Sequence, residues 1–153
     1  MNFRLARPED YATIEPLIID SFEPISAYVD VEASMGLLNG HGWRSRWQNR
    51  IRKAFDTQIV LLGAENDQIV AYASGAIDEA EKLALLDILA VDRLQHGKGY
   101  GRSMLRAFLD HVKQLGAQAV NLECLSDNSV GNSLYESEGF EDVFRTVRWF
   151  KKL

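Results

Sequence analysis

Cysteine and histidine are scarce in this chain. Cys124 is the only cysteine, so no disulfide can form within the chain and no cysteine-based metal cluster is possible. The three histidines, His41, His96 and His111, lie far apart, and none belongs to the paired H-E-x-x-H spacing of a zinc site. The sequence therefore predicts neither a structural nor a catalytic metal ion.

Long apolar runs and an excess of positive charge are also missing. No stretch approaches the roughly 20 apolar residues that cross a bilayer, and the first residues lack the apolar centre of a signal peptide. The 17 basic residues against 22 acidic ones give a net charge of −5. This balance argues against nucleic-acid or membrane binding over the whole surface. We expect a cytoplasmic protein in which any anion site is local.

Repeats, low-complexity tracts and flexible linkers are absent as well. The chain has 153 residues, of which 46% are hydrophobic and 25% charged, as in an ordinary globular domain. Its three prolines all lie within the first 24 residues, so no proline-rich linker divides the rest of the chain. We expect one domain that spans residues 1–153.

Hydrophobic periodicity divides the first part of the chain into helices and strands. A short strand around Phe3 and Leu5 precedes a helix that Asp10 can cap, and a second helical zone ends near Phe55. Three strand-like runs follow and are typical of an antiparallel meander. They cover residues 58–63, 68–77 and 82–91.

The second part begins with the strongest helical pattern, which runs from Gly101 to a stop at Gly116. A strand at residues 119–125 follows, so this helix should connect two parallel strands in a right-handed crossover. A short helix at residues 129–138 and two closing strands, around Phe144 and at residues 147–150, complete the expected order.

A glycine-rich turn lies between the third strand of the meander and the long helix. It reads His96, Gly97, Lys98, Gly99, Tyr100, Gly101 and Arg102. Glycines let the backbone approach a ligand, and the amides and positive dipole end of a helix favour a phosphate. The spacing fits neither a P-loop nor a dinucleotide fingerprint. A flexible turn without a ligand is the plain alternative.

The residues around this turn resemble the acetyl-CoA motif of the GNAT N-acetyltransferase superfamily, [QR]-x-x-G-x-[GA]. Gly99 and Gly101 match, and His96 stands at the Gln/Arg position. Residues 128–135 and the following Gly-Phe pair resemble the family segment N-x-x-A-x-x-L-Y…G-F, with Gly131 in place of alanine. Residues 4–10 resemble its first strand and turn.

The resemblance implies a GNAT-like mixed α/β fold. Its sheet would have about seven strands, mostly antiparallel with one parallel pair, flanked by about four helices. It also implies an N-acetyltransferase that uses acetyl-CoA as cosubstrate and an amine as acceptor. We expect direct attack of the amine on the thioester. A CoA-binding regulatory or interaction module without turnover is the alternative.

The resemblance also assigns site residues. Strand residues Leu89, Ala90 and Val91 would offer backbone groups to the pantetheine arm. The cofactor would further be held by His96, Gly97, Lys98, Gly99, Tyr100, Gly101, Arg102 and Asn128, with Lys98, Arg102 and Arg106 near its phosphates. Tyr135 matches the general acid of the family, although a plain core aromatic is the alternative.

The sequence leaves three candidates for the general base. Asp87 is the only carboxylate in an apolar strand, where burial would raise its pKa toward a useful range. Glu123 is the second candidate and water the third. We interpret Cys124 as a small buried hydrophobe rather than a nucleophile.

Two other features stay open. Five cations surround the tryptophans at positions 43 and 47, and a solvated helix face is favoured there over a nucleic-acid patch. The acceptor amine is not identified, although Glu23, Asp30 and Glu32 make a cationic one conceivable. We expect a monomer or a homodimer.

Overall fold

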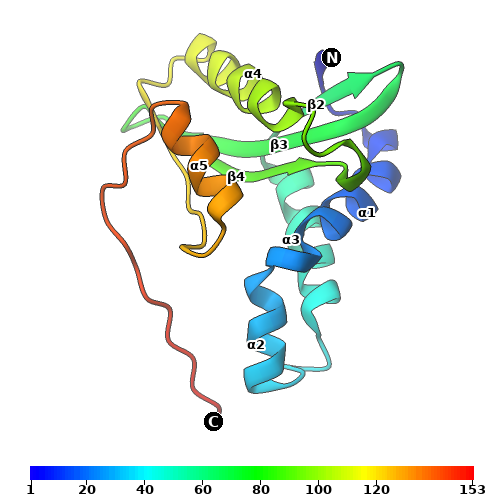
Figure 1. Ribbon diagram of the computed structural model, residues 1–153, viewed down its shortest axis with the longest axis vertical. Helices are drawn as coiled ribbons and strands as arrows, with labels where there is room; N and C mark the ends of the chain where they lie inside the picture. Colours follow the sequence, from blue (N-terminus) through cyan, green and yellow to red (C-terminus); the bar gives the residue numbers. More distant parts are fainter.

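A five-stranded sheet forms the centre of the computed structural model, which describes residues 1–153. The strand order is β1-β2-β3-β4-β5, and the first four strands pair antiparallel as a meander (Figure 1). β5 pairs with β4 in parallel. The strands are β1 (Asn2–Leu5), β2 (Ile59–Glu65), β3 (Gln68–Asp78), β4 (Leu83–Val91) and β5 (Ala119–Asn121).

Five α-helices cover the sheet, one more than the sequence predicted, because the long helical zone before β2 divides into two. They are α1 (Tyr11–Phe22), α2 (Ala27–Met35), α3 (Trp43–Thr57), α4 (Tyr100–Gln114) and α5 (Ser129–Ser137). Ser26 caps α2, since its side chain accepts a hydrogen bond from the Tyr28 amide at 3.1 Å. None of these helices is both long and apolar enough to cross a membrane.

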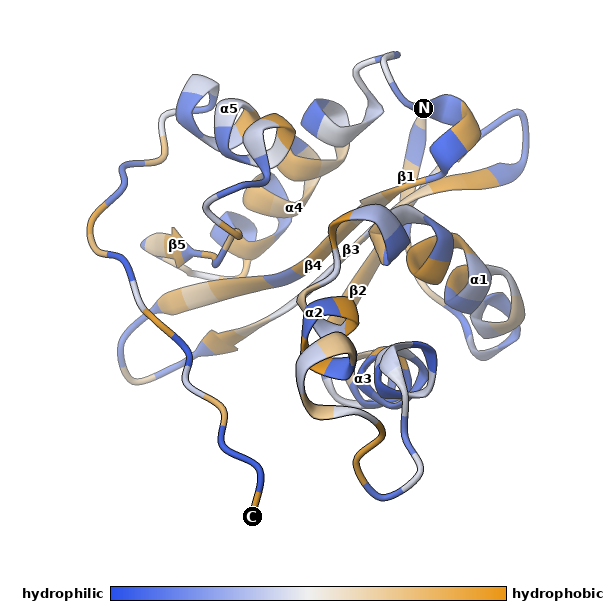
Figure 2. Ribbon diagram, turned by 60° about the horizontal axis from the view of Figure 1, so that its bottom comes forward, coloured by the Kyte–Doolittle hydropathy of each residue, from blue (hydrophilic) through white to orange (hydrophobic).

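Two apolar clusters hold the helices on opposite faces of the sheet. On one face α1 and α3 pack through Ile14, Ile18 and Ile51 against residues of β2, β3 and β4. On the other face α4 buries Met104 and Phe108. Figure 2 shows apolar residues of α1 and α4 on the sides of these helices turned toward the strands. The predicted periodicity of α4 thus corresponds to its buried stripe.

A β-bulge interrupts β4 at Asp87. Ser74 and Gly75 are consecutive in β3, but they pair with Ile88 and Leu86, so Asp87 is the additional residue. The bulge exchanges the two faces of β4, because Leu86 packs with α4 whereas Ile88 packs with α1 and α3. Asp87 is therefore presented on the α3 side of the sheet.

The predicted mixed α/β fold with one parallel pair is confirmed, but the number of strands is smaller than expected. The two closing strands around Phe144 and at residues 147–150 are not formed. The backbone of residues 141–153 donates no hydrogen bond to the rest of the chain, and a strand exists only when a neighbour pairs with it. β5 is also shorter than predicted and ends at Asn121.

Candidate active site

The glycine-rich turn forms a tight path from the end of β4 to the start of α4. Gly97 and Gly99 both have φ of +79°, a left-handed conformation that favours glycine. Gly99 is the N-cap of α4. A ring nitrogen of His96, Nε2, lies 2.9 Å from the carbonyl oxygen of Val91 and ties the turn back to the strand. The turn is therefore held in one shape by its own residues.

The amides of this turn are free of internal partners. The backbone N–H groups of residues 97–102 donate no hydrogen bond within the protein, and the first helical bond is from Ser103 to Gly99 at 3.1 Å. They lie at the positive end of a helix of 15 residues. Consecutive unpaired amides at a helix N-terminus bind phosphate groups. The turn therefore presents free amides at the place where the sequence predicted a phosphate site.

An open edge of β4 leads into this cradle. β4 and β5 pair only at residues 83–85 and 119–121, so the two strands have no ladder beyond Leu85. The Asp92 amide bonds the Val70 carbonyl in β3 at 2.8 Å. Because backbone direction alternates along a strand, Ala90 also faces β3, whereas Leu89 and Val91 face the opening. Leu89 and the amide of Val91 are thus available to a ligand, whereas the Val91 carbonyl is bonded by His96.

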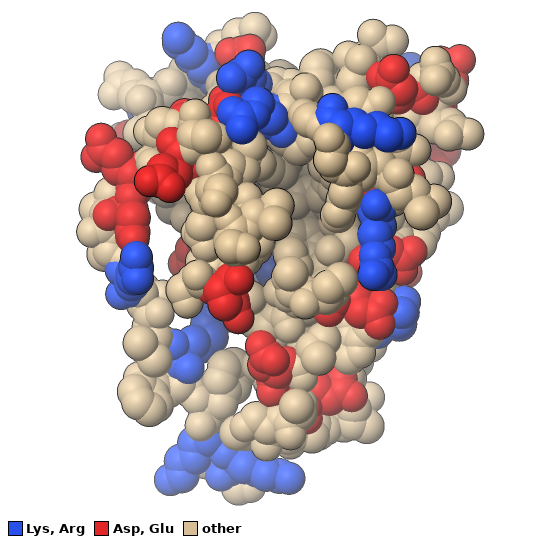
Figure 3. Space-filling view, in the orientation of Figure 1, with Lys and Arg blue, Asp and Glu red and all other residues tan.

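The opening is lined on its far side by α5. Gly101 lies between the two walls, since a Cβ atom added there would meet Val91 of β4 at 3.7 Å and Leu134 of α5 at 3.8 Å. In the space-filling view the molecule is hollowed near the centre of this face, and Lys and Arg side chains gather along the upper margin (Figure 3).

Tyr135 lies on α5 and packs against the α4 cluster. Its ring meets the ring of Phe140 edge-on, with centroids 5.8 Å apart. Burial raises the pKa of Tyr135 to about 12, with a smaller contribution from Cys124. The phenol therefore keeps its proton over the whole physiological pH range. Burial also raises the pKa of the Cys124 thiol, which is half-buried rather than fully buried as predicted.

Asn128 caps α5, because its Oδ1 accepts a hydrogen bond from the Gly131 amide at 3.0 Å. A residue larger than glycine at position 131 would be too close to its neighbours. A Cβ atom there would lie 2.8 Å from the Asn128 side chain and 3.0 Å from the sulfur of Cys124. The glycine in place of the usual alanine thus makes room for Cys124 beneath the cap.

The predicted phosphate-binding cations are partly engaged by the protein itself. Arg102 and Arg106 both form ion pairs with Glu138, the latter at 2.7 Å. The hydrogen bond from Arg106, followed by that from Arg102, lowers the pKa of Glu138. Lys98 donates to Gln95 at 2.6 Å but meets no carboxylate. Of the predicted cations, Lys98 alone keeps its charge uncompensated.

Asp87 lies in a polar cluster beneath the bulge. Arg50 of α3 donates to Asp87 Oδ1 at 2.6 Å and to its carbonyl oxygen at 3.2 Å, and Gln58 donates to Oδ2 at 2.9 Å. Both carboxylate oxygens are therefore occupied. Nearby on β3, the buried hydroxyls of Tyr72 and Ser74 have no hydrogen-bond partner, and burial raises the pKa of Tyr72 to about 12.

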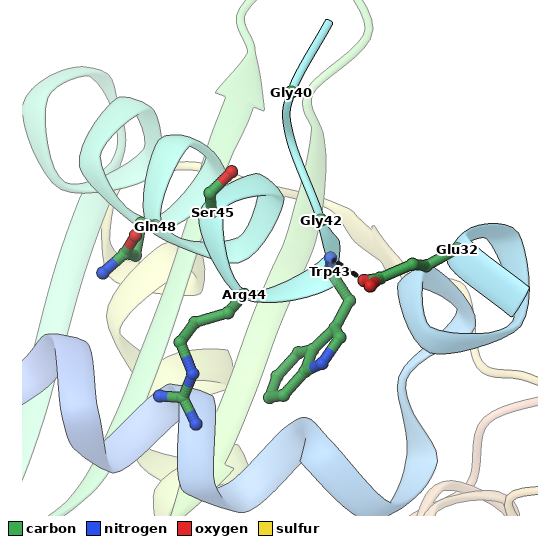
Figure 4. A pocket seen from close by; sticks show the side chains of 7 residues that line it. All are labelled: Glu32, Gly40, Gly42, Trp43, Arg44, Ser45 and Gln48. Carbon is green, nitrogen blue, oxygen red and sulfur yellow. Dashed lines mark hydrogen bonds between the residues drawn. The ribbon is translucent and has the colours of Figure 1, made fainter. Parts of the chain in front are cut away.

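The second candidate base, Glu123, and the acidic residue Glu32 have different surroundings. Glu123 is exposed beyond the end of β5. Glu32 lines a hollow of about 280 Å³ between α2 and α3, where its Oε2 accepts the Trp43 amide at 2.6 Å (Figure 4). This carboxylate caps α3, whose own N-cap is Gly42. Its negative charge therefore stabilises the N-terminus of α3.

The cations of α3 lie over aromatic rings. The guanidinium carbons of Arg44, Arg46 and Arg50 each lie 5.0 Å from the centroid of a neighbouring tryptophan or tyrosine ring. Trp47 is buried, as predicted, and Trp43 is half-buried. The basic stripe is thus a set of packed side chains on an amphipathic helix.

Sequence reasoning missed Arg50 and Glu138 as residues of this region. Arg50 bonds Asp87, 37 positions away, and Glu138 bonds Arg106, 32 positions away. Neither Arg50 nor Glu138 belongs to a local motif. An isolated arginine on a basic helix and a glutamate before a glycine give no signal in the sequence. Only the packing of α3 against β4, and of α5 against α4, brings them to the site.

The separation of β4 from β5 beside the free amides of α4 agrees with the acetyltransferase resemblance that the sequence indicated. The sequence profile described as the acetyltransferase (GNAT) family matches residues 27–140. The chain belongs to this family, as the resemblance indicated.

Relatives with assigned names agree with this family. The chain is 26% identical over 146 residues to the uncharacterized N-acetyltransferase YhfO of Bacillus subtilis, covering 93% of this chain and 91% of that protein. It is 32% identical over 90 residues to the [ribosomal protein bS18]-alanine N-acetyltransferase of Haemophilus ducreyi, covering 58% of each.

Solved structures share the fold at low sequence identity. A variant of the BH1408 protein from Bacillus halodurans superposes with a TM-score of 0.73 at 21% identity, covering 99% of this chain and all of that one. The aminoglycoside N-acetyltransferase AAC(6')-Iy, solved in complex with CoA, gives a TM-score of 0.68 at 9% identity, covering 99% and 100% of the two chains.

Proposed function

We propose that this protein is an acetyl-CoA-dependent N-acetyltransferase that transfers the acetyl group directly to an amine. One observation carries the proposal. The free amides of residues 97–102 open onto the unpaired edge of β4, so a phosphate site and a strand-like binding edge are continuous. An elongated ligand with a pyrophosphate at one end and an amide-bearing arm at the other fits this combination.

The cofactor would be bound mainly by backbone groups. The pyrophosphate would accept hydrogen bonds from the turn and from the first amides of α4. The pantetheine arm would pair with Leu89 and the Val91 amide as an additional strand does, in the gap that β5 leaves, while His96 keeps the Val91 carbonyl. Lys98 would supply the uncompensated positive charge. Arg102 would reach a phosphate only by exchanging its contact with Glu138.

The reaction would follow from this placement. The acceptor nitrogen attacks the thioester carbonyl carbon, and the carbon–sulfur bond breaks. The departing sulfur accepts a hydrogen bond from the Tyr135 hydroxyl, which is neutral at physiological pH, and CoA leaves as a thiolate that takes its proton from water. The attacking amine loses its proton, and the acetylated amine and free CoA result.

We propose that water removes the proton of the amine and that Asp87 positions the bulge. Asp87 has both carboxylate oxygens engaged by Arg50 and Gln58, so neither oxygen is free to receive the proton of the amine. Asp87→Asn separates the two roles. Asparagine still accepts from Arg50, and Gln58 can turn its unpartnered Oε1 toward the new amide. A positioning role predicts at least about a tenth of the wild-type turnover, whereas a base predicts a loss of 10²-fold or more.

The first test is the release of free CoA from acetyl-CoA in the presence of amines. The names of the relatives suggest a panel with alanine-initiated peptides and aminoglycosides, together with polyamines and amino acids. Turnover with at least one amine supports the proposal. Tight binding of CoA without turnover on any amine would favour the silent module.

A second test addresses the cradle itself. Gly101→Val adds a branched side chain between β4 and α5, and we expect CoA affinity to fall more than tenfold, about 1.4 kcal/mol. Lys113→Val places the same β-branched residue at the exposed far end of α4 and should leave the affinity unchanged. Unchanged affinity in folded Gly101→Val protein, measured by calorimetry, would remove the cradle from the mechanism.

A further inference from the structure

Three charged side chains from two helices form an ion-pair cluster beside the glycine turn. Glu138 follows α5, and its carboxylate lies between Arg102 and Arg106 of α4. Arg106 donates to it twice, from Nε to Oε2 at 2.7 Å and from Nη2 to Oε1 at 3.0 Å. Arg102 donates to Oε1 as well. One carboxylate therefore engages both guanidinium groups, and these three residues are called the Glu138 cluster below.

The Glu138 cluster adjoins the amides of the proposed phosphate site. Arg102 is the third residue of α4, and its own amide is one of those that donate no hydrogen bond within the protein. Arg106 follows one turn later on the same face of the helix. The Arg102 guanidinium thus belongs to the same helix turn as the free amides. An anion bound by these amides and the Glu138 carboxylate are two alternative partners for one arginine.

The position of Glu138 is fixed by its backbone. Its amide donates to the carbonyl oxygens of Leu134 and Tyr135, both at 3.1 Å, and closes the last turn of α5. A carboxylate is unfavourable at this end of a helix, because the negative end of the helix dipole lies there. The charge of Glu138 is therefore not placed for the benefit of α5. It is stabilised from α4, chiefly by the hydrogen bond from Arg106, which lowers the pKa of Glu138.

The two arginines of the cluster are open to solvent, whereas the carboxylate is not. The side chains of Arg102 and Arg106 are 43% and 63% exposed, and that of Glu138 is 7% exposed. An anion from solution can therefore reach the guanidinium groups without disturbing the packing of α5. Ion pairs between exposed side chains contribute little to stability, so an exchange of partners at Arg102 costs little.

We propose that Glu138 competes with a phosphate group of the cofactor for Arg102, and that this competition weakens CoA binding and speeds the release of the CoA product. The inference rests on the proposed function. Carboxylate and phosphate oxygens are both strong acceptors for a guanidinium group, but a pyrophosphate carries more negative charge than a carboxylate. The cofactor can therefore take Arg102, and Glu138 takes it back when the cofactor leaves. Product release limits turnover in many enzymes, so a built-in competitor favours turnover.

A purely structural role for Glu138 makes the opposite prediction. A carboxylate that only clamps α5 to α4, or that holds the arginines ready for a phosphate, assists the cofactor site. Removing its charge would then weaken CoA binding or leave it unchanged. Competition instead predicts that removing the charge tightens CoA binding, so the direction of the change in affinity separates the two roles.

Glu138→Gln removes the charge with little change in shape. Glutamine keeps an oxygen that can accept from Arg106, so the contact between the helices remains, as thermal unfolding would verify. We expect the dissociation constant of CoA, measured by calorimetry, and its dissociation rate, measured by stopped flow, each to fall roughly fivefold. Glu136→Gln is the matched control, because Glu136 is an exposed glutamate of α5 without an ion pair. This control makes the same change of net charge and should alter the affinity by less than about twofold.

Arg102→Gln in both backgrounds identifies the contested arginine. Competition predicts that losing Arg102 weakens CoA binding roughly fivefold more in Glu138→Gln protein than in the wild type. Weaker or unchanged CoA binding by folded Glu138→Gln protein would overturn the inference, as would equal effects of Arg102→Gln in the two backgrounds. A wild-type protein that binds no CoA would overturn the proposed function, and the inference with it, so the two failures are distinguishable.

Discussion

Replacing Tyr135 by phenylalanine tests the chemistry at a single oxygen atom. Phenylalanine keeps the edge-on contact with Phe140 at 5.8 Å and the packing against the α4 cluster. The Tyr135 hydroxyl has no hydrogen-bond partner within the protein, so its removal should change the free energy of unfolding by less than about 1 kcal/mol. A change in turnover would then report on the reaction rather than on the fold.

The size of the effect follows from the two pKa values involved. Burial raises the pKa of Tyr135 to about 12, whereas a thiol has an ordinary pKa of about 8.5. Complete proton transfer from the phenol to the departing sulfur would be uphill by about 5 kcal/mol. Tyr135 should therefore act mainly as a hydrogen-bond donor to the developing thiolate. We expect a loss of about 10²-fold in kcat, the low end for a general acid.

The assay is the steady-state release of CoA with the amine that the panel identifies, together with calorimetric CoA affinity and thermal unfolding. Tyr11→Phe is a matched control, because Tyr11 lies on α1 beside Phe55 and burial raises its pKa to about 12 as well. The pH profile adds an independent check. Any basic limb below about pH 11 should persist in Tyr135→Phe, because this phenol does not ionise there. Equal kcat in the variant and the wild type would refute the role of Tyr135.

Three further predictions concern stability and the glycine turn. Gly75→Ala should lower the free energy of unfolding by about 3 kcal/mol or more in urea titrations, because its Cβ would lie 1.9 Å from the Leu85 carbonyl oxygen. His96→Gln should keep CoA affinity within about threefold, since glutamine can also bond the Val91 carbonyl and the amides bind the phosphates; complete loss in a folded variant would assign the histidine a different role. The hydrogen bond from Arg4 lowers the pKa of Asp10 below its ordinary 3.8, so this pair stabilises the protein above about pH 4 and is lost as the pH falls through the lowered value. Asp10→Asn should accordingly lower stability by about 1 kcal/mol at pH 7, and the difference in melting temperature from wild type should vanish in acid.

Local patterns were enough to predict most of the elements. The amphipathic period of α4 arises because this helix buries one face, and the continuous apolar runs of β2 and β3 arise because helices cover both faces of the sheet. Both patterns are visible in consecutive residues. The glycine turn was equally visible, since φ of +79° at Gly97 and Gly99 demands that residue type. For Ala90 the assignment by resemblance needs refinement, because its backbone faces β3 rather than the opening.

The sequence by itself predicted the order of most helices and strands, the family and the glycine turn at the start of α4, because these depend on residues close together in the chain. The tertiary structure alone decided what depends on distant partners. The bulge that turns Asp87 toward Arg50 is a property of the register between β3 and β4. The pairing of Arg102 with Glu138 requires α5 to pack beside α4. The same reason explains the closing strands, because alternation shows that a segment can pair, whereas only an available neighbouring strand makes it do so.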